Sequence, residues 1–117
     1  MSETASSGGP AGWLTLPEVA ARLGVRESKV HQMIRDGGLI AVWRDGARMV
    51  PVELVDNASV LKHLPGVVTL LRDAGYNDDE SLRWLYQADD SLPGTPLQAL
   101  AGRSATEVKR RAQALGF

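Results

Sequence analysis

The chain has 117 residues, enough for a single modest core, and its formal net charge of −1 excludes a protein that is cationic overall. The absence of cysteine excludes disulfides and thiolate metal sites. Hydrophobic residues make up 44% of the chain, as in ordinary globular proteins, and no apolar run approaches the roughly 18 residues that a membrane span needs. The start also lacks the basic and apolar segments of a secretion signal, so we expect a cytoplasmic protein that contacts no membrane.

Residues 1–12, "MSETASSGGPAG", are small, polar and rich in glycine. They can bury little apolar surface, so we expect a disordered tail. Its hydroxyl-bearing residues are Ser2, Thr4, Ser6 and Ser7. The tail is either a solvated leader or a regulatory phosphorylation site, and a phosphate there would add roughly −1.5 to −2 charges.

A first helix is predicted to begin after Thr15, which forms a Thr-x-x-Glu capping box with Glu18 and is followed by a proline in the first turn. The residues on its apolar face are Leu16, Val19, Ala20 and Leu23. Gly24 ends this helix, and we expect Val25 to be buried in the turn that follows.

A second helix is predicted from about Arg26 to Asp36, ended by Gly37-Gly38. Its apolar face holds Val30, Met33 and Ile34. The opposite face holds Ser28, Gln32 and Arg35, with Lys29 and His31 on its flanks. Glutamine can pair with adenine, arginine with guanine, and serine with a base edge or a phosphate. This strip is either the solvated face of an amphipathic helix or a surface that enters a major groove.

Asp45-Gly46 stands between two β-prone runs and predicts a two-residue hairpin. In that register Arg44 pairs with Ala47, Trp43 with Arg48, and Val42 with Met49. Trp43 and Arg48 would then lie close enough for a cation–π contact, and Arg44 and Arg48 would stand near the hairpin tip. Arginines on such a wing can contact phosphates or a minor groove. The alternative for Trp43 is packing against the body of the protein.

A short helix from about Val52 to Val55 follows, and residues 61–117 are predicted to be helical throughout. Within this half, Gly75 ends one helix, Asn77 begins the next, and Thr95-Pro96 begins a third. Ser104 and Glu107 predict a capping box for the last helix. The residues predicted to line that helix are Val108, Ala112 and Leu115. Its cations, Lys109, Arg110 and Arg111, either complement the helix dipole or form a second phosphate-binding patch.

The charges are unevenly divided along the chain. Residues 13–51 contain six Lys or Arg and four Asp or Glu, whereas residues 52–117 contain seven cations and nine anions. The helix–hairpin region is therefore the cationic part of a nearly neutral protein. It offers only about six cations to phosphates, which leaves a homodimer open as an alternative to a weakly binding monomer.

Patterns typical of catalysis are not found. His31 and His63 lie far apart without carboxylates at ligand spacing, and no P-loop, dinucleotide or Ser/His/Asp pattern occurs. We therefore expect no enzyme, no metal and no cofactor.

The segments "TLPEVAARLGV", "KVHQMIRDGGLIAV" and "VPVEL", with the hairpin, resemble the winged helix-turn-helix domains of the excisionase and MerR-like type. The resemblance implies that the second helix enters the major groove and that the wing contacts the backbone. Arg26 stands where that family usually has Ser or Thr, which weakens the helix cap by about 0.5–2 kcal/mol.

The segments "LPGVVTLLRDAGYNDDESLRWLYQADDSLPGTPLQAL" and "EVKRRAQALGF" resemble a small actinobacterial family. Its members are DNA-binding proteins with an N-terminal winged helix-turn-helix, a helical C-terminal domain, and a leader phosphorylated by a serine/threonine protein kinase. The resemblance implies a phosphorylated hydroxyl in the leader, which does not match the family residue by residue; our hypothesis is Thr4, with Ser6 and Ser7 as alternatives.

A weaker likeness runs through "LRWLYQADDSLPGTPLQAL", which is similar to the toxin-binding half of Xre/MbcA/ParS-type antitoxins. It would make the helical half a protein-interaction module. The simpler interpretation is that the shared residues are core: Trp84, Leu85, Leu97 and Leu100.

Together these patterns predict a mainly α protein with a tail (1–12), a winged helix-turn-helix domain with a small β-hairpin (13–60) and a helical C-terminal domain (61–117). We expect it to bind double-stranded DNA as a transcriptional or nucleoid regulator. The residues predicted to contact DNA are Arg26, Ser28, Lys29, His31, Gln32, Arg35, Arg44 and Arg48. The rival hypothesis is an antitoxin-like module whose helical half binds a partner protein.

Overall fold

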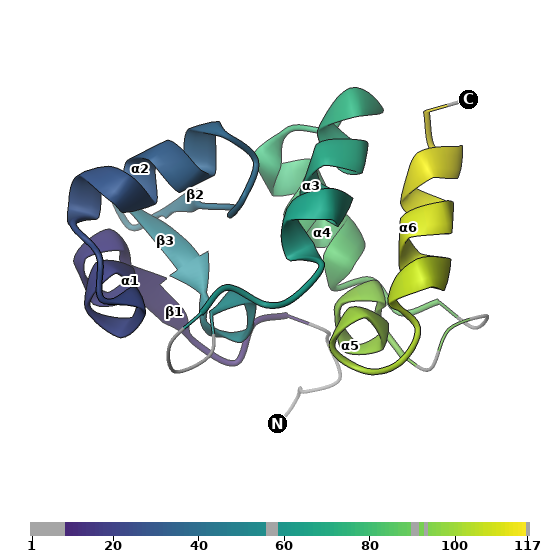
Figure 1. The fold of residues 1–117 in the computed structure, drawn as a ribbon, viewed down its shortest axis with the longest axis horizontal. Helices are drawn as coiled ribbons and strands as arrows, with labels where there is room; N and C mark the ends of the chain where they lie inside the picture. Colours follow the sequence, from purple (N-terminus) through teal and green to yellow (C-terminus); the bar gives the residue numbers. More distant parts are fainter. Residues whose placement is uncertain (1–8, 56–58, 90–91, 93, 117) are drawn as a thin grey trace.

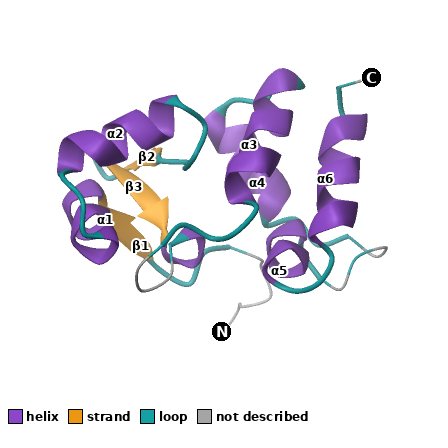
Figure 2. Cartoon of the chain, in the orientation of Figure 1, coloured by secondary structure: helices purple, strands orange, loops and turns teal. Residues whose placement is uncertain are grey.

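The computed structural model describes residues 9–55, 59–89, 92 and 94–116. Figure 1 shows two helices and a three-stranded sheet on one side of the molecule, and the four later α-helices on the other. Helices dominate, and the strands are confined to the first half of the chain (Figure 2). The predicted mainly α fold is confirmed.

Helix α1 (Leu16–Leu23) begins at the predicted capping box. The Glu18 amide donates to the Thr15 hydroxyl over 3.3 Å, and the Thr15 amide donates to the Glu18 carboxylate over 2.7 Å. That backbone hydrogen bond is the main reason that the pKa of Glu18 is lowered. Gly24 ends the helix in the left-handed region at φ 69°, which glycine adopts without a steric penalty. The expectation that Val25 is buried is wrong: the residue is 36% exposed, and its backbone amide donates a hydrogen bond to the Ala20 carbonyl.

Helix α2 (Glu27–Arg35) packs against α1, and the sheet lies beside this pair (Figure 1). Strands β2 (Val42–Arg44) and β3 (Ala47–Pro51) form the predicted hairpin in the predicted register. Asp45 and Gly46 both have positive φ, as a type I′ turn requires.

A third strand, β1 (Trp13–Thr15), was not predicted. It pairs antiparallel with β3, so that the sheet order is β1-β3-β2 and Leu14 lies opposite Val50. Three residues that end at the capping threonine carry too little alternation to be recognised as a strand, and the pairing partner lies more than 30 residues further along the chain.

The winged half ends with the 3₁₀ helix η2 (Val52–Leu54), close to the predicted short helix. The helical half contains α3 (Leu64–Asp73), α4 (Asp78–Leu85), α5 (Pro96–Ala101) and α6 (Ala105–Ala114). Capping boxes begin α4, from Asn77 and Glu80, and α5, from Thr95 and Gln98.

The predicted capping box at Ser104 is wrong. The Ser104 backbone has φ −109° and ψ 26°, and its side chain makes no cap hydrogen bond. Glu107, the other half of the predicted box, instead pairs with Arg110 and Arg111 further along α6. Leu115 is 37% exposed, so only Val108 and Ala112 of the predicted apolar set are buried.

The buried apolar residues of the described chain form one hydrophobic cluster that contains residues of both halves. It extends from Leu14 and Val30 through Leu54 and Leu64 to Val108. No helix in the described part of the chain is long and apolar enough to cross a membrane.

Candidate nucleic-acid interface

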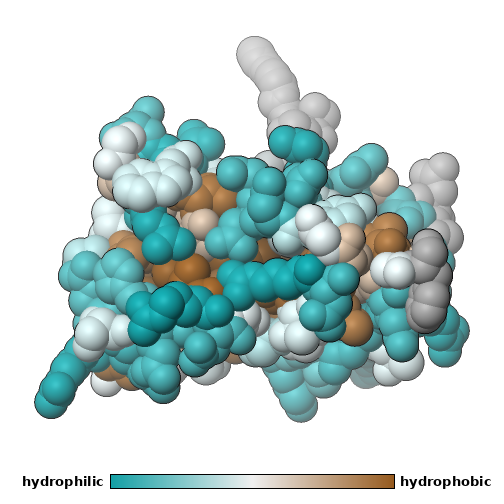
Figure 3. Space-filling view, turned by 90° about the horizontal axis from the view of Figure 1, so that it is seen from above, coloured by the Kyte–Doolittle hydropathy of each residue, from teal (hydrophilic) through white to brown (hydrophobic). Residues whose placement is uncertain are grey.

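The polar strip of α2 is exposed. Val30 and Ile34 are buried beneath the helix and Met33 is half-buried, as the helical periodicity predicts. The exposed residues on the other side are Ser28, Lys29, Gln32 and Arg35. Helix α2 runs along the upper edge of the molecule in Figure 1, and the face seen from above is mostly hydrophilic, with hydrophobic residues visible mainly in its hollows (Figure 3).

The N-terminal end of α2 lacks a side-chain cap. Arg26 occupies the N-cap position in an extended conformation, and its side chain makes no cap hydrogen bond. The amides of Lys29 and Val30 donate to the Arg26 carbonyl over 3.0 and 3.4 Å. The two amides before them belong to the first turn, where an α-helix offers no acceptor of its own. Because Arg26 and Lys29 are exposed beside these amides, this end of α2 is suited to an anion.

Two carboxylates reduce the positive charge around the strip. His31 Nε2 lies 3.4 Å from the carboxylate of Glu27, one turn earlier on the same helix. Asp36 follows the last helical residue and is exposed. His31 is therefore paired within α2. Gln32 and Arg35 are exposed, and they lie in sequence between Glu27 and Asp36.

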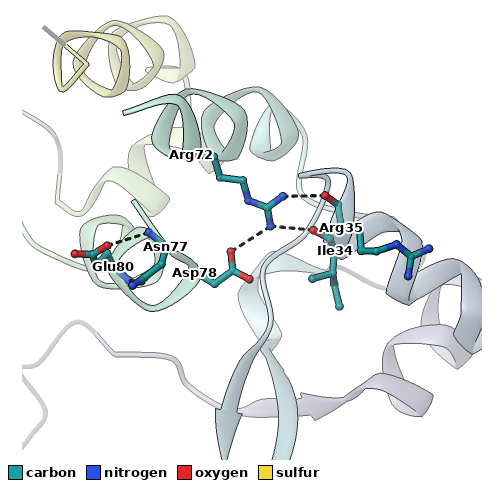
Figure 4. Close-up of polar contacts among 6 residues, drawn as sticks. All are labelled: Ile34, Arg35, Arg72, Asn77, Asp78 and Glu80. Carbon is teal, nitrogen blue, oxygen red and sulfur yellow. Dashed lines mark hydrogen bonds and ion pairs between the residues drawn. The ribbon is translucent and has the colours of Figure 1, made fainter. Parts of the chain in front are cut away.

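The C-terminal end of α2 is held by a residue of α3. Arg72 donates one hydrogen bond to the Ile34 carbonyl over 2.8 Å and another to the Arg35 carbonyl over 3.2 Å. The same guanidinium pairs with Asp78 at 3.1 Å (Figure 4). The sequence gives no sign of these contacts, because the partners of Arg72 on α2 lie 37 and 38 residues away.

The two wing arginines lie on opposite faces of the sheet. Arg44 pairs with Ala47 and Arg48 with Trp43, and neighbouring residues of β3 point to opposite faces. We expected a cation–π contact between Trp43 and Arg48, and this contact is not found among the described residues. Instead, the Arg44 guanidinium lies 4.3 Å from the centroid of the Trp13 ring.

The unpredicted strand β1 explains this difference. Trp13 is paired with Pro51 and Arg44 with Ala47, and these β3 residues are four apart, so that Trp13 and Arg44 share a face. Trp43 is 70% exposed, so the alternative that it packs against the body is wrong.

Arg48 is less accessible than the sequence suggested. It is half-buried and lines a depression of about 480 Å³ together with Trp43, Arg72, Asp78 and Asp79. The two carboxylates at the start of α4 lower the positive potential around it. Arg44, by contrast, is exposed near the hairpin tip.

The cations of α6 are mostly paired with anions or neighbours. Arg110 and Arg111 both pair with Glu107, Arg111 also lies 3.6 Å from Asp89, and Lys109 lies 3.4 Å from His63. These contacts favour the interpretation that they stabilise α6 over a second phosphate-binding patch. Among the described residues, no cluster of three His, Asp or Glu side chains could hold a metal ion.

The residues of the antitoxin-like motif lie in the helical half. Leu85, Leu97 and Leu100 are buried, and Trp84 is half-buried against the same core. They occupy the core positions that the simpler interpretation assigns to them. Thr4, the predicted phosphorylation site, lies outside the described residues.

Two family models together match most of the chain. One, described as "DNA-binding protein Rv2175c, wHTH domain", matches residues 10–55. The other, described as "Rv2175c C-terminal domain of unknown function", matches residues 61–116.

Relatives and a solved structure agree with these models. The chain is 44% identical over 115 residues to the DNA-binding protein Rv2175c of Mycobacterium tuberculosis (strain ATCC 25618 / H37Rv), covering 87% of this chain and 79% of that protein. It is 52% identical over 42 residues to an excisionase of Streptomyces ambofaciens, covering 36% of this chain and 68% of that protein. An NMR structure of Rv2175c superposes with a TM-score of 0.80 at 36% identity and covers all of both chains.

The excisionase likeness falls on the winged half, as the sequence indicated, and the family is described by DNA binding rather than by an enzymatic activity. The chain belongs to the Rv2175c family of DNA-binding proteins, with a winged helix-turn-helix domain followed by the family's helical C-terminal domain.

Proposed function

We propose that this protein binds double-stranded DNA with α2 in the major groove. In this arrangement Ser28, Gln32 and Arg35 face the base edges. Arg26, Lys29 and Arg44 contact phosphates, and His31 and Arg48 flank the groove. The observation that carries the proposal is the exposed strip of α2, which joins amide, hydroxyl and guanidinium groups on a helix whose other face is buried.

The two halves of the chain have different roles in this proposal. We assign DNA contact to residues 13–60 and a supporting role to residues 61–117, because Arg110 and Arg111 of α6 are paired with anions of their own half. The winged half of one copy offers only about six cations to phosphates, so we expect a homodimer to bind a specific site more tightly than a monomer.

We further propose that the protein acts in the cytoplasm as a transcriptional or nucleoid regulator, and that a serine/threonine protein kinase modulates it at Thr4. The support lies where the leader joins the fold. Gly9 and Pro10 line a groove of about 530 Å³ whose other lining residues include the cations Arg44 and Arg83 and the carboxylate of Asp79. Thr4 is five residues before Gly9, a reach of at most about 18 Å, so a phosphate on it can approach Arg44 of the wing.

The test is fluorescence anisotropy of a labelled mixed-sequence duplex with the full chain at several salt concentrations. About four to six phosphate contacts predict that the affinity falls roughly 10²–10³-fold between 50 and 200 mM salt. Salt-independent binding, or no binding at low salt, would overturn the proposal and turn attention to the helical half as a protein-interaction module.

A further inference from the structure

The last turn of α2 is closed by groups from outside the helix. The final carbonyls of any α-helix lack partners within it. The Asp36 amide donates to the Gln32 carbonyl and the Gly38 amide to the Met33 carbonyl, over 2.9 and 2.8 Å. The carbonyls of Ile34 and Arg35 receive the guanidinium of Arg72, which belongs to α3.

Arg72 is itself anchored. Its Nη2 lies 3.1 Å from the Asp78 carboxylate, and both side chains are less than one-third exposed. Asp78 is the first residue of α4, where an acidic side chain also complements the helix dipole. Gly37 packs close by, because a Cβ atom there would lie 3.4 Å from Arg72 Nη1. The guanidinium therefore fits between two helices of the C-terminal half and the end of α2.

The position of Arg72 relative to Arg35 matters for DNA binding. Arg72 binds the backbone carbonyl of Arg35, while the Arg35 side chain points away from it (Figure 4). We propose that Arg72 is a positioning residue, through which the helical C-terminal half holds the last turn of α2 and so fixes the direction of Arg35 toward DNA. This inference rests on the proposed function of α2 and assigns a role to a domain whose family description gives none.

A phosphate contact by Arg72 itself is a different hypothesis with a different outcome. The donors of Arg72 bind two carbonyls and a carboxylate. Binding three acceptors in this arrangement requires the planar, forked guanidinium group. Lysine keeps the positive charge but presents a single ammonium. Arg72→Lys should therefore impair the positioning of α2 but preserve the electrostatic attraction of DNA, so it separates the two hypotheses.

The first measurement needs no DNA. Amide hydrogen exchange of the full chain is compared for the wild type, Arg72→Ala, Arg72→Lys and the control Arg103→Ala, which removes an exposed arginine in the second half of the chain. We expect the amides of Asp36, Gly37 and Gly38 to exchange about tenfold faster in both Arg72 variants, with α1 unchanged. Equal protection of these amides in all four proteins would overturn the proposal.

The second measurement is duplex affinity by anisotropy. We expect Arg72→Ala and Arg72→Lys to weaken binding about tenfold, and Arg103→Ala less than twofold. In an Arg35→Ala background the effect of Arg72→Ala should fall below about twofold, because Arg72 acts through Arg35. Wild-type affinity of Arg72→Lys, or a full effect in the Arg35→Ala background, would overturn the proposal.

Failure of the proposed function and failure of the Arg72 proposal can be told apart. If the wild type binds no duplex, the proposed function is overturned, and the exchange comparison alone decides whether Arg72 holds α2. If Arg72→Ala does not fold, Asp78→Asn replaces it, since it keeps Arg72 but neutralises its anchor. We then expect about threefold faster exchange at the end of α2, and an unchanged rate would overturn the proposal.

Discussion

The hydroxyl of Tyr86 donates a hydrogen bond to Glu53 Oε1 over 2.6 Å. The other oxygen of this carboxylate accepts from the Ala11 amide over 2.9 Å. Glu53 therefore joins the end of α4 to the segment that leads into β1. Burial, together with this hydrogen bond to Glu53, raises the pKa of Tyr86 above its ordinary value.

Replacing Tyr86 with phenylalanine should destabilise the fold. The variant loses one hydrogen bond to a carboxylate, but Glu53 is exposed enough for water to replace part of it, so we expect a cost of about 1 kcal/mol at pH 7. Thermal unfolding measures it, with Tyr76→Phe as the control, because Tyr76 is half-buried and makes no such bond among the described contacts.

The same comparison has a pH dependence. Since the folded pKa of Tyr86 is raised, its contribution is fully present below the unfolded value near 10 and is lost as the pH rises through the folded pKa. The stability gap between wild type and Tyr86→Phe should therefore be constant up to about pH 10 and narrow above it. A gap that widens above pH 10 would contradict this assignment.

Placing serine at position 26 should stabilise α2 and weaken DNA binding at once. Arg26 holds the extended N-cap conformation without a cap hydrogen bond, and a serine hydroxyl there can accept one from the first turn. We expect Arg26→Ser to gain about 1 kcal/mol in unfolding free energy. If Arg26 contacts a phosphate, the slope of log affinity against log salt concentration should decrease in magnitude by about one.

Arg26→Ala is the control for that variant, since it removes the charge without adding a cap. It should show the same loss of salt dependence and no gain in stability. An unchanged salt dependence in both variants would remove Arg26 from the interface.

The two wing arginines should contribute unequally. Arg44 is exposed near the hairpin tip, whereas Arg48 is half-buried beside Asp78 and Asp79, whose charges repel a phosphate. We expect Arg44→Ala to lower the salt dependence by about one phosphate contact and Arg48→Ala to leave it nearly unchanged. The reverse order in the anisotropy titrations would show that the wing approaches DNA by its other face.

Negative charge in the leader should weaken DNA binding. We compare Thr4→Glu with Thr4→Ala, each with Ser6 and Ser7 replaced by alanine. Because Glu adds one charge where a phosphate adds roughly −1.5 to −2, we expect about threefold weaker binding at low salt and a smaller difference as salt rises. Equal affinities of the two variants at low salt would count strongly against regulation through Thr4.

The elements that could be predicted from the sequence are those with local causes. The box of Thr15 and Glu18, the turn at Asp45-Gly46 and the periodicity of α2 each lie within a few residues, and all three appear as expected. The failed prediction at Ser104 shows the limit of such signals. Glu107 had cationic neighbours one turn away, and pairing with them replaced the cap.

The features that escaped prediction depend on distant segments. Strand β1 exists because β3 offers it a partner, and the contact of Arg44 with Trp13 follows from that pairing. The bonds from Arg72 to the end of α2 join segments nearly 40 residues apart. Neither a helical period nor a cap signal carries information about such contacts, so the exposed strip of α2 was predictable but its support was not.

The most direct test of the central claim is the affinity of the Gln32→Ala/Arg35→Ala variant for a labelled duplex. The matched control is Arg110→Ala/Gln113→Ala, which removes the same residue types from the exposed face of α6. If α2 reads DNA, the first variant should bind at least about tenfold more weakly than wild type and the control within about twofold. Equal losses in the two variants, or none in the first, would contradict a recognition role for α2.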